Sequence, residues 1–270
     1  MKRLFSPHHG HDLVVGGRRR APAHGRRLHL AKYIKREEIA VPDCDYSPGA
    51  LGLTNVLGND RLGDCTCAGA GHMIEVITAA AGSPVEITTE QVIALYEATC
   101  GYKPGDPTTD RGGDEYSVLA YLAERGFDGQ GLHKIFGSVV INATEWDEVR
   151  FAQFAFGALY HGQEMPDSFI SPFPSGPGFV WDVGGEPNPD NGHCFITYGA
   201  NTDSLLVDTW GLLGHITKGA VAKYGASVAG GEIHVPITRE WLNAASQRSP
   251  SGLAWDELLA DLERLGGVTS

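Results

Sequence analysis

The sequence has no run of about 18 consecutive apolar residues, which a membrane-spanning helix would need. An apolar run near its start, Leu13–Val15, is far shorter than the core of a signal peptide. No segment repeats elsewhere in the chain. We therefore predict a globular protein with no membrane segment, and the absence of a secretion signal favours a cytoplasmic or virion-associated location.

Cysteine is scarce and its count is odd, which does not favour a disulfide framework in a chain of 270 residues. Five cysteines suit a reducing compartment or a single reactive thiol. The Cys-x-Cys pair and the lone His-Cys dipeptide match no common zinc spacing. We therefore expect neither a metal nor a cofactor at the set that could be imagined as a zinc site: Cys65, Cys67, His72, His193 and Cys194.

Acidic residues are almost absent from residues 1–36, which hold ten of the 21 lysines and arginines but only Asp12 of the 33 acids. The remainder of the chain is correspondingly acidic. We predict that residues 1–36, called the arm below, form an extended basic segment. Docking on its own acidic body or on a neighbouring copy is favoured over binding to nucleic acid, and self-assembly or a partner protein stays open.

Helical patterns dominate the first half of the chain and apolar, β-branched runs the second. This segregated order predicts an α+β fold. We expect helices near 64–81, 88–100, 114–125 and 144–156, strands near 134–143, 156–166 and 230–237, and a hairpin of two strands at 192–201 and 204–211. Leucines at helical spacing predict a C-terminal helix within 251–270.

One constellation suits nucleophilic catalysis. Cys65 stands at the first turn of a predicted helix, where unpaired amides and the helix dipole favour a thiolate. His193 and Asp208 lie on the two strands of the predicted hairpin and could supply a base and a group that orients it. Cys65 could instead be a buried core residue, and Cys67 could be the reactive thiol.

The order of these residues resembles that of papain-like cysteine peptidases. In this sequence "DTWG" at 208–211 stands where that family has "NSWG", and "GGDEYSVLAYLAERG" at 112–126 resembles its glycine pair and following helix. Asn59, six residues before Cys65, stands where the family has an oxyanion glutamine. The similarity runs from about Pro42 to Ile237.

The resemblance implies a two-lobed papain-like domain over 37–250, with a helical lobe near 60–135 and a β lobe near 136–240. It implies a Cys65, His193, Asp208 triad, an oxyanion role for Asn59, and a substrate cleft that includes Gly112, Gly113 and Trp210. Thr66 replaces an aromatic residue, Asn59 is one methylene shorter than glutamine, and the arm is too short for the inhibitory propeptide of secreted members.

The predicted function is therefore a thiol hydrolase that cleaves an amide or isopeptide bond of a peptide or amide substrate. Two alternatives stay open at this point. One is a papain-like component of an assembly, such as a phage virion, docked through the arm, because the sequence is similar in character to bacterial and phage proteins. The other is acyl transfer of the transglutaminase kind.

Overall fold

The computed structural model describes residues 1–21, 27–34, 41–238, 241 and 255–264. Helices dominate the first half of the body and strands the second, which confirms the α+β prediction. No helix among the described residues is both long and apolar enough to span a bilayer.

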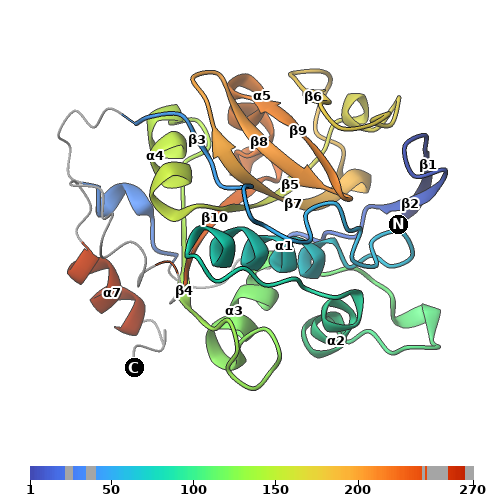
Figure 1. Ribbon diagram of the computed structural model, residues 1–270. Helices are drawn as coiled ribbons and strands as arrows, with labels where there is room; N and C mark the ends of the chain where they lie inside the picture. The colour runs from blue at the N-terminus through green and yellow to red at the C-terminus, as the bar shows by residue number, and fades with distance from the viewer. Residues whose placement is uncertain (22–26, 35–40, 239–240, 242–254, 265–270) are drawn as a thin grey trace.

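One mixed, mostly antiparallel sheet forms the β half (Figure 1). Its strands run in the order β4 (Ile135–Val140), β10 (Glu232–Thr238), β5 (Leu159–Glu164), β7 (Gly192–Ala200), β8 (Ser204–Thr209), β9 (Leu212–Thr217) and β6 (Val180–Trp181), and β3 (Cys44–Asp45) also pairs with β7. Among the described strands of this sheet, β6 and β9 are the pair that runs parallel. Every residue of β7 is buried, so this strand lies at the centre of the core.

Helix α1 (Cys65–Ala80) lies between this sheet and the helices α2 (Thr89–Cys100) and α3 (Glu115–Arg125). It is buried from Cys65 to Thr78 because it is covered on both sides. Gly69 allows its close approach to β7, since a Cβ there would stand 3.2 Å from the Tyr160 ring and 3.5 Å from the Cys194 sulfur. Cys65, at the start of α1, is therefore placed firmly against the sheet.

The predicted helix ends agree with their capping chemistry. Thr88 and Gln91 form a capping box at the start of α2, and Gly101 ends that helix in the left-handed region at φ 73°. The Asp114 side chain accepts from the Ser117 amide at the start of α3. These contacts confirm the second and third predicted helices.

Further helices lie among and after the strands. They are α4 (Trp146–Phe156), α5 (Lys218–Tyr224) and α7 (Trp255–Arg264). Short 3-10 turns lie at Leu30–Lys32, Pro107–Thr109, Asp167–Phe169, Pro189–Asn191 and Ser227–Ala229. The α7 helix confirms the predicted C-terminal helix, whose flanks at 251–254 and 265–270 lie outside the described residues.

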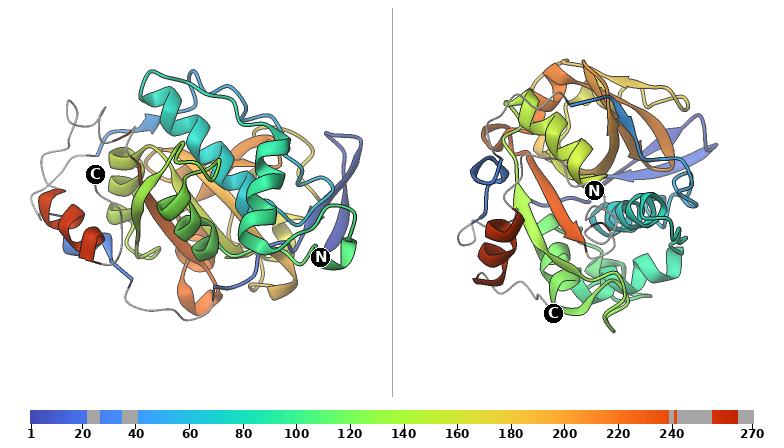
Figure 2. Two further views of the ribbon diagram at one scale, coloured as in Figure 1. Left: turned by 90° about the horizontal axis from the view of Figure 1, so that it is seen from below. Right: turned by 60° about the vertical axis from the view of Figure 1, so that its left-hand side comes forward.

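The arm departs from the prediction of a purely extended segment. Its start folds into a hairpin of β1 (Lys2–Ser6) and β2 (His11–Val15), at the opposite end of the molecule from α7 (Figures 1 and 2). Leu13 and Val15 on β2 are fully buried. The described part of the arm therefore lies on its own body.

Candidate active site

Cys65 is the first residue of α1 and is only 1% exposed. It lines a cavity of about 10 Å³ together with His193 and Trp210. This is about the room that one water molecule needs. The sequence placed these residues in one site, and the structure brings them to one cavity.

The His193 ring is held by two neighbours at the start of β7. Its Nε2 lies 2.7 Å from the Thr209 hydroxyl, and the Trp210 ring is stacked on it with centroids 3.9 Å apart. Its Nδ1 is buried and has no hydrogen-bond partner among the described residues. Nδ1 is therefore the ring nitrogen that remains available to a group in the cavity.

Asp208 does not take the expected position beside His193. β7 and β8 pair with Ile196 opposite Asp208, so Asp208 shares a face with Ile196, and the next residue, Thr209, shares the other face with His193. The Asp208 carboxylate instead lies 3.4 Å from Nδ1 of His72 on α1. The residue that hydrogen-bonds the histidine is therefore Thr209, which the sequence analysis did not select.

His72, which the sequence analysis named only in the set not expected to bind zinc, also lines this cavity. Its Nδ1 lies 3.0 Å from a Glu75 oxygen, as well as near Asp208. Burial raises the pKa of Asp208 to about 7, although the His72 charge acts in the opposite direction. Burial disfavours the charged form of His72, but Asp208 and Glu75 together raise its pKa. The three residues form a buried polar cluster behind the candidate nucleophile.

Asn59 lines the cavity, but its amide does not point a free donor into it. The Asn59 Nδ2 donates to the Leu62 carbonyl at 2.9 Å and to Oδ1 of Asp64 at 3.2 Å. Asp64 stands at the N-cap of α1, yet its side chain accepts no helix amide. Both amide hydrogens of Asn59 are thus hydrogen-bonded, because the buried Asp64 carboxylate accepts from Asn59 and not from the helix amides.

The arm covers this site. The Val14 amide donates to the Asn59 carbonyl at 3.1 Å, and the Trp210 indole donates to the Val14 carbonyl at 3.2 Å. Gly17 and Arg18, further along the arm, are buried. The arm therefore passes across the candidate site from the Asn59 loop toward the start of β7.

Backbone hydrogen bonds hold the arm on both walls of this cleft. The Gly113 amide donates to the Gly17 carbonyl at 2.9 Å, and the Arg19 amide donates to the Gly113 carbonyl at 2.7 Å. On the opposite wall the Arg18 amide donates to the Gly192 carbonyl at 3.0 Å. Gly113, predicted to line the substrate cleft, thus binds an extended segment of the chain itself.

Two cleft glycines leave room for the arm backbone. A Cβ on Gly112 would stand 2.0 Å from the Gly17 carbonyl oxygen, and a Cβ on Gly192 would stand 2.4 Å from that of Arg18. Gly192 has φ −53° and ψ 120°, which other residues adopt freely. A side chain at position 192 would therefore clash with the arm but would not strain its own backbone.

Burial keeps the candidate pair neutral. It raises the pKa of the Cys65 thiol, although the Cys194 backbone amide bonded to the sulfur acts in the opposite direction. Burial lowers the pKa of His193 to about 3. A thiolate and an imidazolium are therefore both disfavoured while the arm is in place.

The alternative thiol, Cys67, is also buried but faces another way. Its sulfur lies 3.6 Å from the Thr99 hydroxyl on α2 and does not line the cavity. Burial raises its pKa well above the ordinary value. In the described part of the chain, no three His, Cys, Asp or Glu side chains are arranged to hold a metal ion.

Sequence comparisons give no relatives: no protein-family model and no curated protein matches. The structure does match solved structures. Xylellain, a cysteine protease from Xylella fastidiosa, superposes with a TM-score of 0.63 at 12% identity, over 88% of this chain and 98% of xylellain. Digestive procathepsin L 3 from the larval midgut of Tenebrio molitor superposes with a TM-score of 0.57 at 14% identity, over 81% of this chain and 76% of the procathepsin.

A plant enzyme extends the likeness. The Carica candamarcensis cysteine protease CMS1MS2, solved in complex with E-64, gives a TM-score of 0.50 at 14% identity, over 74% of this chain and 99% of the enzyme. Identities this low establish the fold alone. The chain therefore has a divergent papain-like, two-lobed fold.

Proposed function

From this papain-like fold and the cavity shared by Cys65 and His193, we propose that the protein is a thiol hydrolase that cleaves amide bonds in peptides. The observation that carries the proposal is the position of Cys65 at the start of α1, in one cavity with a histidine whose Nδ1 is unpaired. A thiol at a helix N-terminus with a histidine partner is the arrangement that activates cysteine nucleophiles.

The arm supports a peptide as the substrate. It lies in the cleft as extended backbone, hydrogen-bonded to Gly113 on one wall and to Gly192 on the other. A cleft that binds its own chain in this way has the width and the donors for another extended polypeptide. A substrate therefore takes the place of the arm, which has to move aside first.

The reaction follows from the side chains that remain once the arm has moved. Return of water relieves the desolvation of Cys65 and His193, so that the thiol proton passes to Nδ1 and the thiolate attacks the carbonyl carbon. The backbone amide of Cys65 donates to the oxyanion, as expected of the helix start. The His193 imidazolium then protonates the leaving amine, and water, deprotonated by the same ring, hydrolyses the thioester.

Thr209 and Trp210 would position the base. The Thr209 hydroxyl holds Nε2, which leaves Nδ1 directed to the cavity, and Trp210 covers one face of the ring. Asp208 is not assigned contact with the base here, because its neighbour is His72. Its proposed role is electrostatic support of the α1 side of the site, through His72.

Covalent labelling tests the proposal. The full chain is incubated with iodoacetamide or with E-64, and the modified residue is located by mass spectrometry. We expect modification of Cys65, which Cys65→Ala abolishes and Cys67→Ala retains. His193→Ala should lower peptide cleavage by about 10²–10⁴-fold, the range of general acid–base catalysis.

The arm slows the access of reagents to Cys65, so the deciding measurement uses a variant in which the arm is held less tightly. In Gly192→Ala the added methyl group opposes the Arg18 carbonyl, and labelling should be faster. Absence of modification at Cys65 in this variant would overturn the proposal.

A further inference from the structure

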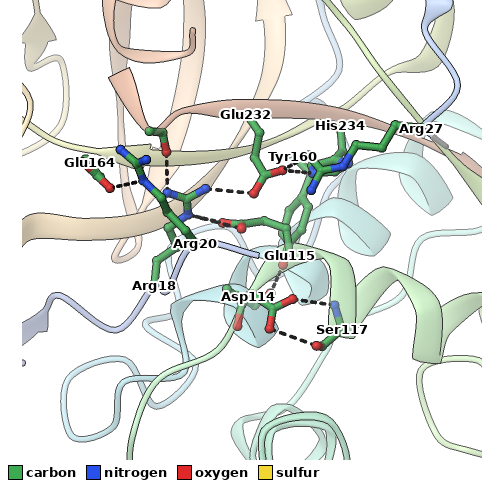
Figure 3. A network of polar contacts seen from close by, with 12 residues as sticks. Arg18, Arg20, Arg27, Asp114, Glu115, Ser117, Tyr160, Glu164, Glu232 and His234 are labelled. Carbon is green, nitrogen blue, oxygen red and sulfur yellow. Dashed lines mark hydrogen bonds and ion pairs between the residues drawn. The ribbon is translucent and has the colours of Figure 1, made fainter. Parts of the chain in front are cut away.

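A buried acidic pocket lies beside the candidate nucleophile and is filled by Arg18 of the arm (Figure 3). The Arg18 Nε lies 3.0 and 3.2 Å from the two Glu115 oxygens, and its Nη2 lies 2.9 Å from Glu232. Its Nη1 donates to the Gly230 carbonyl at 2.7 Å. All three guanidinium nitrogens are thus bonded, in three directions.

Residues from distant parts of the chain build this pocket. Glu115 is the first residue of α3, two positions after Gly113, and Glu232 lies on β10. Gly162 on β5 forms a wall, since a Cβ there would stand 2.2 Å from Glu115 Oε1 and 2.7 Å from Arg18 Nε. We call Glu115, Gly162, Gly230 and Glu232 the acidic pocket.

The pocket requires a cation. Glu115 is fully buried, and the only cationic nitrogens within ion-pair distance of it, among the described residues, belong to Arg18. Glu232 differs, because Arg27 and His234 also contact its Oε2, at 2.6 and 3.1 Å. A buried carboxylate with no counter-charge is strongly unfavourable, and burial raises the pKa of Glu115 to about 7 although the Arg18 charge acts in the opposite direction, so an occupant that brings no charge binds less well than a cation.

The geometry selects a guanidinium among cations. A planar fork can meet Glu115, Glu232 and the Gly230 carbonyl at once, whereas the single nitrogen of lysine cannot span the three positions that Nε, Nη1 and Nη2 occupy. The pocket therefore recognises arginine by shape as well as by charge.

Arg18 enters the pocket from a segment bound as extended backbone. Its own amide bonds Gly192, and its neighbours Gly17 and Arg19 bond Gly113. A substrate that replaces the arm in this cleft has to direct a side chain into the same pocket. If it brought none, Glu115 would be left buried without a counter-charge.

We propose that the acidic pocket selects peptide substrates with an arginine side chain close to the cleaved bond, and that Arg18 occupies this specificity site in the closed chain. The inference rests on the proposed hydrolase function. It adds the substrate class and assigns Glu115 and Glu232 as the specificity-determining residues.

Chemical rescue tests the pocket without catalysis. The full chain with Arg18→Ala is heated with millimolar ethylguanidinium, which is the part of arginine that the substitution removes. We expect this cation to raise the thermal midpoint of the variant by several degrees relative to the same concentration of neutral ethylurea, and to leave the unsubstituted chain unchanged. Addition of Glu115→Gln should abolish the rescue.

Substrate scanning tests the specificity. Fluorogenic peptides that carry arginine or norleucine at each position near the cleaved bond are offered to the Arg18→Ala chain. We expect at least a tenfold preference for arginine at one position, lost on addition of Glu232→Gln. Should Arg18→Ala fail to fold, Arg18→Lys is used, since it keeps a charge for Glu115 but lacks the planar fork.

The outcomes separate the two proposals. Cleavage that prefers norleucine or shows no preference at every position overturns the arginine pocket and leaves the hydrolase intact. Equal midpoints with ethylguanidinium and ethylurea also overturn it, and identify Arg18 as a structural contact of the arm only. Failure of both cleavage and Cys65 labelling removes the hydrolase, and the substrate proposal with it, even if rescue succeeds.

Discussion

At one end of the covered cleft, Cys65 and His193 lie uncharged around a cavity of about 10 Å³. Close to Cys65, Arg18 lies charged between two carboxylates, every guanidinium nitrogen bonded. The same arm supplies Arg18 and bonds to Asn59 and Trp210, which line the cavity. The comparison teaches that burial alone keeps Cys65 and His193 neutral, whereas at Glu115 the Arg18 charge acts against burial, which raises the pKa of that carboxyl to about 7.

The largest expected effect is on the charged end. Arg18→Ala leaves Glu115 buried without its counter-charge, so we expect a loss of about 3–5 kcal/mol in the free energy of unfolding. Urea denaturation measures it. Arg19→Ala, an exposed neighbour on the same arm, is the matched control and should stay within about 0.5 kcal/mol.

A second substitution sharpens this result. Adding Glu115→Gln to Arg18→Ala removes the stranded charge and should restore part of the lost stability. Equal stability of the single and double variants would contradict the account of Arg18 as a counter-charge.

The next effect concerns pH at the uncharged end. The folded pKa of His193 is about 3, below the ordinary 6.5, so only the unfolded chain takes up this proton between those values. Stability contributed by neutral His193 is present above about pH 6.5 and is lost as the pH falls toward 3, by about 1.4 kcal/mol per pH unit. His193→Gln should lower the slope of unfolding free energy against pH by that amount.

Asp208 supplies a control of opposite sign. Its folded pKa is about 7, above the ordinary 3.8, so its contribution is present at low pH and is lost as the pH rises through 7. Asp208→Asn should therefore remove a loss of stability that develops between about pH 3.8 and 7. If both variants changed the slope in the same direction, the contrast between the two groups would be wrong.

A smaller effect separates the arm from the uncharged end. In Gly192→Ala the new methyl group opposes the Arg18 carbonyl, and crowding of this kind costs about 1–3 kcal/mol. We expect Cys65 alkylation to accelerate about tenfold, with its pH profile moved to lower pH as water reaches the thiol. The matched control is Gly176→Ala, whose Cβ would meet only ordinary contacts, the nearest at 3.6 Å.

The smallest effect is the loss of one hydrogen bond to the arm. Trp210→Phe keeps a ring over His193 but removes the indole bond to the Val14 carbonyl, worth about 1 kcal/mol. Alkylation of Cys65 should be a few times faster. Trp181→Phe loses a similar indole bond, to the Phe169 carbonyl at 3.1 Å, and should be destabilised without faster alkylation.

Local patterns predicted much of this molecule. Apolar periodicity placed α1, α2 and α3, and the turn at 201–203 predicted the hairpin of β7 and β8. The short strand β9 and helix α5 were missed, because glycine at 211 and 214 interrupts the apolar pattern there. The papain-like fold followed from motif order rather than from periodicity.

The features that the sequence could not predict depend on contacts between residues far apart in the chain. Whether Asp208 or Thr209 meets His193 depends on a one-residue choice of register, and a bulge between Thr197 and Gly199 shifts that register within the β7 and β8 pair. The position of the arm depends on close contacts at isolated glycines, which have no periodic signature. The run of polar groups around Asn59 likewise gave no sign that its amide turns to Asp64.

A glycine codon becomes an alanine codon by a single base change, so the Gly192→Ala variant that we expect to loosen the arm lies one mutation away. Such a change would alter no residue that contacts the thiol and would require no unusual backbone angle. We therefore expect selection to retain glycine at this position in any lineage that benefits from a latent chain, and to release it where constant exposure of the cleft is harmless.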